Sequence, residues 1–174
     1  RSHIFLNEVG GASALGGIQT QQIRNESNGT LDLNLIEKGI RRSGGARPVS
    51  RLLCLENTHN YCSGAVLSVD YMEAASDLAH RNGLKVHVDG ARIFNAAISL
   101  DISVDRLVAD ADTVTFCLSK GLSCPVGSIV CGSSDFIATA HRIRRMLGGG
   151  MRQVGILAAA GLYALDNMVD RLHE

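Results

Sequence analysis

The feature that most constrains the fold of this chain is an alternation of short apolar runs with stretches of helical periodicity. The runs at 51–56, 84–88 and 112–118 have the length and apolar content of buried strands. The first two are followed by helical stretches at 68–82 and 91–98. Strands that alternate with helices pair in parallel, because the intervening helix returns the chain across the sheet. The sequence therefore predicts an α/β fold with a mostly parallel sheet covered by helices on both faces.

The remaining segments are less regular, and none suggests an internal repeat or a second domain. Ser68 is a candidate N-cap for the helix at 68–82, and Gly83 is expected to end it. A chain of 174 residues suits one compact domain. We expect further extended segments at 3–6, 17–24 and 125–131, and further helices at 8–15, 31–41, 103–109, 135–147 and 151–172.

The charge balance argues against nucleic acid and membrane as partners. Seventeen basic residues offset seventeen acidic ones, so no overall field attracts a polyanion. No stretch reaches the roughly 20 apolar residues that span a bilayer. One local exception is the basic group Arg142, Arg144 and Arg145, which is either the solvated face of a helix or a phosphate-facing cluster.

The cysteines favour a reducing compartment. Their number, five, is odd, and no two form a Cys-x-x-Cys pair, so neither a disulfide framework nor a metal site is predicted. A cytoplasmic location is expected. Because the sequence begins at Arg1, a mitochondrial targeting segment upstream is the alternative.

Two charged residues follow predicted strands and carry the chemical argument. Asp89 comes directly after the run at 84–88, and Lys120 follows the run that ends at Ser119. The carboxyl ends of strands line the ligand crevice in open α/β sheets. An amine and a carboxylate at that edge suit pyridoxal phosphate, with Lys120 holding the cofactor as a Schiff base and Asp89 keeping its ring nitrogen protonated.

Each of these residues also has a structural interpretation. Lys120 is an exposed turn residue in one reading, whereas at the mouth of a buried strand desolvation would favour its uncharged, nucleophilic amine. Asp89-Gly90 is common in hairpins, but the helical segment after it favours a strand-to-helix turn. Arg92, in the first turn of that helix, either binds a phenolate or carboxylate in the crevice or forms a structural ion pair.

Histidines supply the candidate acid–base groups. His59 lies in the polar cluster that follows the strand at 51–56, and His3 lies beside another strand-like segment. A single histidine is more often a hydrogen-bonded structural residue than a catalytic one. The glycines at 148–150 precede Arg152 and form either a phosphate-side loop or a hinge.

Five motifs taken together resemble the low-specificity threonine aldolases, which are pyridoxal-phosphate enzymes of fold type I. The resemblance covers nearly the whole chain. It rests on SHIFLNEVGGASALGG, LLCLENTHN, LKVHVDGARIFNAA, TFCLSKGLSCPVGS and RRMLGGGMRQVGILAAAGLYAL, which occur in that order.

The resemblance implies roles for the residues at the strand ends. Lys120 of SKGL would bind pyridoxal phosphate covalently, and the preceding Ser119 would belong to the same cofactor site. Asp89 of HVDGAR would bond to the pyridinium nitrogen. Arg92 would hold the ring oxygen of the cofactor or the carboxylate of the substrate.

The resemblance also assigns four residues outside those turns. His3 matches a histidine that stacks on the cofactor ring, and His59 matches a second active-site histidine near the substrate hydroxyl. Arg152 matches an arginine associated with the cofactor phosphate, within one subunit or reaching into a neighbour's site. Arg145 falls near the same pocket. No metal is implied.

The implied reaction is cleavage of threonine or allo-threonine-like β-hydroxy-α-amino acids to glycine and an aldehyde, a carbon–carbon lyase activity of threonine catabolism and glycine biosynthesis. The base is His59 or a water molecule that it holds. The family also implies a homo-oligomer, a tetramer.

The chain departs from the family pattern at its ends. A preceding segment with a phosphate-binding turn and a C-terminal small domain are missing, so we expect residues 1–174 to form part of the large domain. Apolar surface of the helix after 151 should then lie uncovered. Two alternatives therefore stay open: a catalytically impaired fragment or isoform that acts only through subunit association, and another lyase or transaminase of fold type I.

Overall fold

A computed structural model describes residues 1–174, which fold around a four-stranded sheet in the order β1–β2–β3–β4. The first three strands are parallel, and β4 pairs antiparallel with β3. The predicted α/β class with a mostly parallel sheet is confirmed. The strands are β1 (Leu52–Glu56), β2 (Lys85–Asp89), β3 (Thr113–Cys117) and β4 (Ser128–Gly132).

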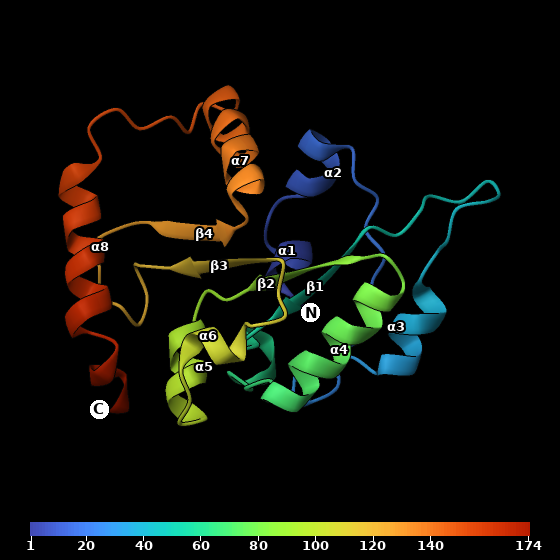
Figure 1. Cartoon of the computed structure of the whole chain (residues 1–174), viewed down its shortest axis with the longest axis horizontal. Coiled ribbons are helices and arrows are strands. Elements are labelled where there is room, and N and C mark those ends of the chain that lie inside the picture. The colour runs from blue at the N-terminus through green and yellow to red at the C-terminus, as the bar shows by residue number, and fades with distance from the viewer.

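Helices connect the parallel strands, and α3, α4, α5 and α6 gather on one side of the sheet (Figure 1). Helices α2 and α7 lie on the opposite side. The α-helices are α1 (His3–Leu6), α2 (Gly11–Gly16), α3 (Leu33–Gly39), α4 (Val69–Arg81), α5 (Ile93–Ser99), α6 (Val104–Leu107), α7 (Ser134–Met146) and α8 (Gly155–Asn167). Two 3-10 turns, η1 (Asn60–Cys62) and η2 (Asp170–His173), complete the chain.

The core lies between the sheet and the helices α4 and α5. Ser68 caps α4 as predicted, because its hydroxyl accepts a hydrogen bond from the backbone of Tyr71. The helix then turns a stripe of small and apolar side chains toward β2, where Val86 and Val88 are fully buried. This packing fixes β1 and β2 firmly in the sheet, with Met72, Ala75, Leu78 and Ala79 as the buried contribution of α4.

Two segments predicted as extended have different structures. Residues 3–6 form the helix α1 instead of a strand, and residues 17–24 contain no strand. The backbone and ring of His3 hydrogen-bond to Glu56 at the end of β1. This long-range contact holds the N-terminal segment against the sheet end, and local sequence does not reveal it.

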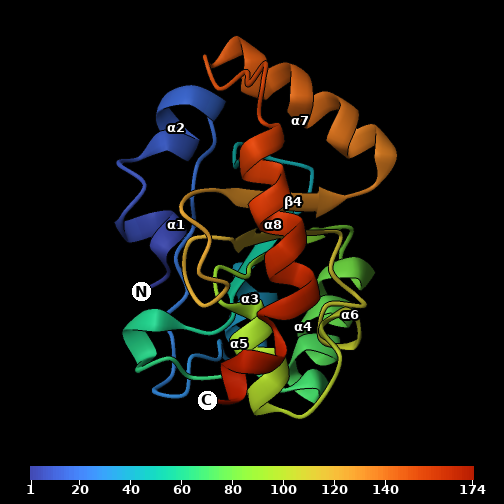
Figure 2. The same ribbon diagram turned by 90° about the vertical axis from the view of Figure 1, so that its left-hand side faces the viewer.

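The β4 side of the sheet is far more open than predicted. Every residue of β4 is exposed, so the expectation of helices covering both faces is wrong at this edge strand. The arrow of β3 points toward α8 in Figure 1, and Figure 2 shows α8 in front of that end of the sheet. Only a small cluster of Leu118, Leu122, Cys124 and Ala164 joins α8 to the loop after β3. The uncovered apolar surface expected on this helix is present: Ile156 is 87% exposed.

Candidate active site

The carboxyl ends of the three parallel strands form one edge, and the predicted site residues at the strand ends gather along it. Glu56 pairs with Asp89 across β1 and β2, and Asp89 pairs in turn with Thr115 of β3. The chain leaves each strand here through a polar turn. Because neighbouring parallel strands end at the same level, the turns after β1, β2 and β3 lie side by side.

Asp89 is half-buried, and its carboxylate accepts one hydrogen bond, from the backbone N–H of Ala91 to Oδ1 at 3.3 Å. Its charge acts on the strands beside it. Burial, reinforced by the Asp89 carboxylate, raises the pKa of the Cys54 thiol to about 11. Burial lowers the pKa of His87, and the same carboxylate offsets part of that change. The free oxygen of Asp89 is thus available to a cation or an N–H donor.

Backbone packing makes the turn after β2 specific to glycine. A side-chain carbon at Gly90 would lie 2.8 Å from the carbonyl oxygen of Thr115, closer than real contacts allow. The Gly90 N–H donates to that same oxygen. This tight turn brings α5 directly onto the strand end, with Arg92 at its N-cap position. Arg92 is half-buried, and its guanidinium has no hydrogen-bond or ion-pair partner, so the structural ion pair that the sequence also allows is absent.

Lys120 and Ser119 follow β3 and are both exposed. The expectation that the Lys120 amine would be desolvated is therefore wrong for this chain by itself. The backbone of the turn is nonetheless ordered, because the Lys120 carbonyl accepts a hydrogen bond from Ser123. The following Gly121 packs so closely on α5 that an added side-chain carbon would lie 2.7 Å from Oδ1 of Asn95. The turn that carries the amine is thus held against α5, the helix whose N-cap is Arg92.

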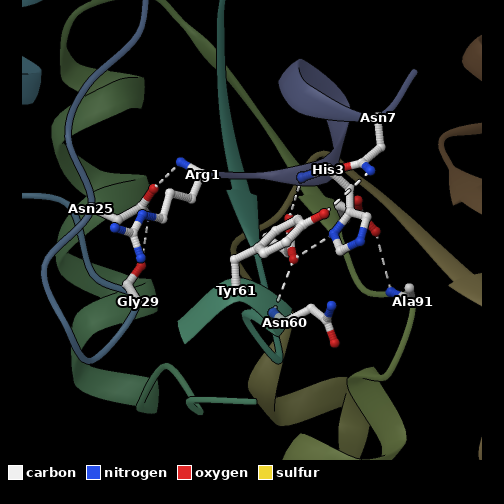
Figure 3. Close-up of polar contacts among 10 residues, drawn as sticks. Arg1, His3, Asn7, Asn25, Gly29, Asn60, Tyr61 and Ala91 are labelled. Atoms are coloured by element: carbon white, nitrogen blue, oxygen red, sulfur yellow. Dashed lines mark hydrogen bonds and ion pairs between the residues drawn. The ribbon is translucent and has the colours of Figure 1, made fainter. Parts of the chain in front are cut away.

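His3 reaches the same edge from α1. Its backbone N–H donates to Oε2 of Glu56 at 2.7 Å, and its Nδ1 lies 2.9 Å from Oε1. The ring also stacks on Tyr61, with ring centroids 5.2 Å apart and an interplanar angle of 29° (Figure 3). Tyr61 accepts a hydrogen bond from the side chain of Asn7, so α1 and the turn after β1 are joined twice.

Glu56 is the buried carboxylate on which these contacts converge. Its side chain is 3% exposed, and it accepts a third hydrogen bond from the backbone of Asn60. Burial by itself would raise the pKa of the Glu56 carboxyl, but the donors from His3 and Asn60 outweigh it and leave the pKa below its ordinary value. Glu56 is therefore ionised at neutral pH.

His59 occupies a different environment from the one predicted. The residue is 1% exposed, and neither ring nitrogen has a hydrogen-bond partner. Gly29 packs against it so closely that an added carbon would lie 2.9 Å from the His59 Cβ. Burial lowers the pKa of His59, with Glu56 offsetting part of the change. Both ring nitrogens are enclosed and unpaired in this chain, and contact of His59 with the substrate hydroxyl stays a prediction.

Arg145 and Arg152 lie away from the strand ends. Together with Arg142 and Arg144 they line an open basic cleft of about 520 Å³ between the end of α7 and the glycine loop. The cleft lining includes none of Asp89, Arg92 or Lys120, so the structure does not bring the two predicted phosphate-associated arginines to the Lys120 edge.

Sequence reasoning missed Glu56 and Tyr61. Glu56 ends a predicted strand just as Asp89 does, and that shared position was the signal that could have identified it. Tyr61 had no comparable signal, because its stacking partner lies 58 residues earlier in the chain.

Two further observations bear on the kind of site. No group of three or more His, Cys, Asp or Glu side chains is arranged to hold a metal ion. None of the helices combines the length and apolar character required to cross a bilayer.

Two low-specificity L-threonine aldolases match the chain across its length. It is 49% identical over 174 residues to low-specificity L-threonine aldolase 1 of Arabidopsis thaliana, covering 99% of this chain and 49% of that protein. It is 47% identical over 173 residues to the low specificity L-threonine aldolase of Escherichia coli K12, covering 99% of this chain and 51% of the enzyme. The resemblance to threonine aldolases is confirmed, and the chain spans about half the length of these relatives.

Solved structures show the same fold. The threonine aldolase of Leishmania major superimposes with a TM-score of 0.80 at 20% identity, covering 98% of this chain and 50% of that one. A Listeria monocytogenes protein solved as a candidate L-allo-threonine aldolase gives a TM-score of 0.85 at 24% identity, with 98% and 45% covered. The sequence model of the beta-eliminating lyase family matches residues 1–174. With the entire sequence matched, this chain belongs to the beta-eliminating lyase family.

Proposed function

We propose that the protein that contains these 174 residues is a pyridoxal-phosphate-dependent carbon–carbon lyase. It cleaves threonine, allo-threonine and similar β-hydroxy-α-amino acids to glycine and an aldehyde. The observation that carries the proposal is the placement of Asp89 and the Lys120 turn at the ends of adjacent parallel strands. The names of the Arabidopsis and Escherichia coli relatives supply the reaction.

The groups at this edge fit pyridoxal phosphate chemically. Lys120 offers an amine with no side-chain partner, and Asp89 has a carboxylate oxygen to spare. Arg92 offers a guanidinium with no partner within the chain. A primary amine, a carboxylate and a guanidinium are the groups that bind the aldehyde, the ring nitrogen and an anionic oxygen of this cofactor. A C-S lyase from Staphylococcus hominis solved with pyridoxal phosphate shares the fold, at a TM-score of 0.57.

Each residue then has a defined task. Pyridoxal phosphate, when bound, supplies an electron sink for the pair released on cleavage of the Cα–Cβ bond. Lys120 attaches the cofactor through its Nζ atom. Asp89 holds the proton on the ring nitrogen, because an ionised carboxylate beside it favours the charged form. Arg92 binds an anionic oxygen of the cofactor or the substrate, and the turn at Gly90 sets its distance from Asp89.

Reduction with borohydride tests the attachment. The chain has three lysines, Lys38, Lys85 and Lys120, so two internal controls are present. We expect borohydride treatment of the full-length protein with pyridoxal phosphate to label Lys120 alone, as read by peptide mass mapping. Equal labelling of Lys38 and Lys85 would show that the amine at the end of β3 has no special affinity for the cofactor.

Product analysis tests the reaction. Threonine incubated with the full-length holoenzyme should yield glycine and acetaldehyde in equal amounts. A keto acid produced from threonine with transfer of its amino group would instead identify a transaminase.

The proposal extends to the assembly and the compartment. We propose a homo-oligomer, a tetramer, in which the cleft of Arg145 and Arg152 serves a cofactor site other than the one at its own Lys120. The separation of that cleft from the Lys120 edge and the open surface of β4 and α8 support it. Five unpaired thiols support a cytoplasmic location. Light scattering of the full-length protein should give four times the chain mass; the mass of a monomer would refute the assembly.

A further inference from the structure

We propose that Glu56 positions His3 for proton transfer, by holding the Nδ1–H of the ring so that Nε2 is unprotonated and faces the crevice. This inference rests on the proposed function for its substrate, but the tautomer of the ring can be tested without it. The proposal assigns a role to a buried carboxylate that the reaction scheme above leaves unused.

Three donors reach the Glu56 carboxylate, and both of its oxygens are engaged. Oε2 accepts from the backbone N–H of His3, at 2.7 Å. Oε1 accepts from the backbone N–H of Asn60 at 3.1 Å and lies 2.9 Å from Nδ1 of His3. The carboxylate is buried within this set and ionised, as its lowered pKa indicates. An ionised carboxylate has lone pairs and no proton to donate.

The tautomer of His3 follows from this chemistry. A contact between Nδ1 and a carboxylate oxygen at 2.9 Å is a hydrogen bond only if Nδ1 carries the proton. A neutral imidazole has one N–H, so its Nε2 must then present a lone pair. The backbone bond from the same residue to Oε2 fixes the position of the carboxylate relative to His3, because one residue supplies both donors.

The free nitrogen of His3 is accessible, unlike those of its neighbour His59. The His3 side chain is 27% exposed. The only buried side-chain nitrogen or oxygen atoms without a partner belong to His59. Tyr61 covers one face of the His3 ring and so limits its rotation (Figure 3). Of the two histidines predicted from sequence, only His3 combines an orienting carboxylate with an open nitrogen.

The proton transfer balances as follows. The hydroxyl proton of the β-hydroxy-α-amino acid moves to Nε2 of His3, and the electron pair of the O–H bond forms the C=O bond of the aldehyde. The Cα–Cβ bond breaks, and its pair remains at Cα. The ionised Glu56 stabilises the positive charge on the His3 imidazole through Nδ1–H, as an orienting carboxylate stabilises a histidine base. The ring then returns its proton to solvent, and Cα takes up a proton to give glycine.

The direct test is the tautomer of His3 in the cofactor-free chain. Nitrogen-15 labelling of histidine and long-range proton correlation at pH 8 distinguish Nδ1–H from Nε2–H, with His3→Gln used to assign the signals. We expect Nδ1–H in the unmodified chain. Glu56→Gln, which leaves one acceptor oxygen for three donors, should shift His3 toward Nε2–H. A His3 ring protonated at Nε2 in the unmodified chain overturns the proposal, whether or not the variant folds.

The chain offers a matched control in Asp112, a carboxylate that also contacts a histidine and a backbone N–H. It lies 2.9 Å from Nε2 of His80 and accepts from Val86 at 2.8 Å, at the amino end of β2. Asp112→Asn should leave the His3 signals unchanged. An equal shift of the His3 signals in this variant would show that they report general loosening of the fold.

Kinetics of the full-length holoenzyme supply the second arm. Glu56→Gln should lower kcat for threonine by roughly 100-fold with little change in KM, the size of effect expected when a general base is disoriented. The double variant Glu56→Gln/His3→Gln should lose no more kcat than His3→Gln alone, because the effects of substitutions in residues that act as one unit do not add. Additive losses would overturn the proposal. If no variant or parent protein cleaves threonine, the proposed function fails while the tautomer measurement still decides the role of Glu56.

Discussion

The two halves of the sheet differ sharply in how their residues are held. Around β1 and β2, the strand ends are fixed by buried side chains and by paired polar groups, as in the contacts of Glu56 with His3 and Asn60. In β4 and α7 no residue is buried, and in α8 only Gly161 and Ala164 are. Lys120 stands where the two halves meet. The comparison teaches that the chain fixes the carboxylate side of its site by its own contacts and leaves the amine open.

The largest expected effect is a loss of activity on substitution of Lys120, an exposed residue beside the open half of the sheet. Lys120→Arg keeps the charge but removes the primary amine that attaches the cofactor. We expect threonine cleavage by the full-length enzyme to fall on the order of 1000-fold or more, about 4 kcal/mol in activation free energy. Since the side chain is exposed, the free energy of unfolding should change by less than about 0.5 kcal/mol. Activity near that of the parent enzyme would contradict the assignment.

The second prediction compares one substitution in both halves. Leu55 of β1 is 3% exposed and Leu162 of α8 is 65% exposed. Leu55→Ala should lower the free energy of unfolding by about 2 to 4 kcal/mol, because it removes buried apolar surface and leaves a cavity. Leu162→Ala should change it by less than about 0.5 kcal/mol. Urea unfolding of the 174-residue chain measures both, and equal costs would erase the distinction between the halves.

The third prediction compares two glycines. Gly90→Ala places a carbon 2.8 Å from the backbone oxygen of Thr115 and should destabilise the chain by about 1 to 3 kcal/mol. Nothing lies within 4 Å of the corresponding position at Gly155, the first residue of α8. Gly155→Ala should leave stability unchanged or raise it by up to about 1 kcal/mol. Thermal unfolding distinguishes them, and a Gly90→Ala variant as stable as the parent would show that the turn after β2 can widen.

The smallest expected effect lies at the amino end of β2, where Asp112 contacts Lys85, His80 and the Val86 backbone. Burial alone would raise the pKa of Asp112, but these donors outweigh it and lower the pKa to about 2. The folded state therefore binds the proton less readily than the unfolded chain, whose pKa is near 3.8. The resulting stabilisation is present above pH 3.8 and is lost as the pH falls through about 2.

Asp112→Asn measures that contribution. Lys85 is 72% exposed, so solvent screens the pair and we expect a loss of only about 1 kcal/mol at pH 7. The difference between parent and variant should shrink as unfolding is measured at progressively lower pH. A difference that stays constant down to pH 2.5 would mean that the carboxylate charge is not the source of the stability.

Local pattern in the sequence predicted the elements whose packing is also local. The Ser68 cap, the helix that follows it and the three parallel strands were all anticipated, because apolar period and capping residues determine them. Asp89 and Lys120 were found because strand ends line the crevice in this class of fold.

What sequence reasoning missed depends on long-range partners. The sequence predicts an extended segment at 3–6, but these residues form the helix α1. In this helix His3 contacts Glu56, 53 residues away. His59 is a candidate acid–base group because it lies in a polar cluster, but the sequence does not show that Gly29 packs on it and that the residue is buried. The apolar strand before Lys120 predicts a buried amine. The exposure of Lys120 depends instead on what covers the open half of the sheet, which the strand does not determine.

The most direct test of the account is a crystal structure of the full-length protein with pyridoxal phosphate. We expect the cofactor to be joined to Nζ of Lys120, with a carboxylate oxygen of Asp89 within about 2.6 to 3.2 Å of the ring nitrogen. Attachment to another lysine, or a ring nitrogen that makes no contact with Asp89, would contradict the claim that these two strand ends form one cofactor site.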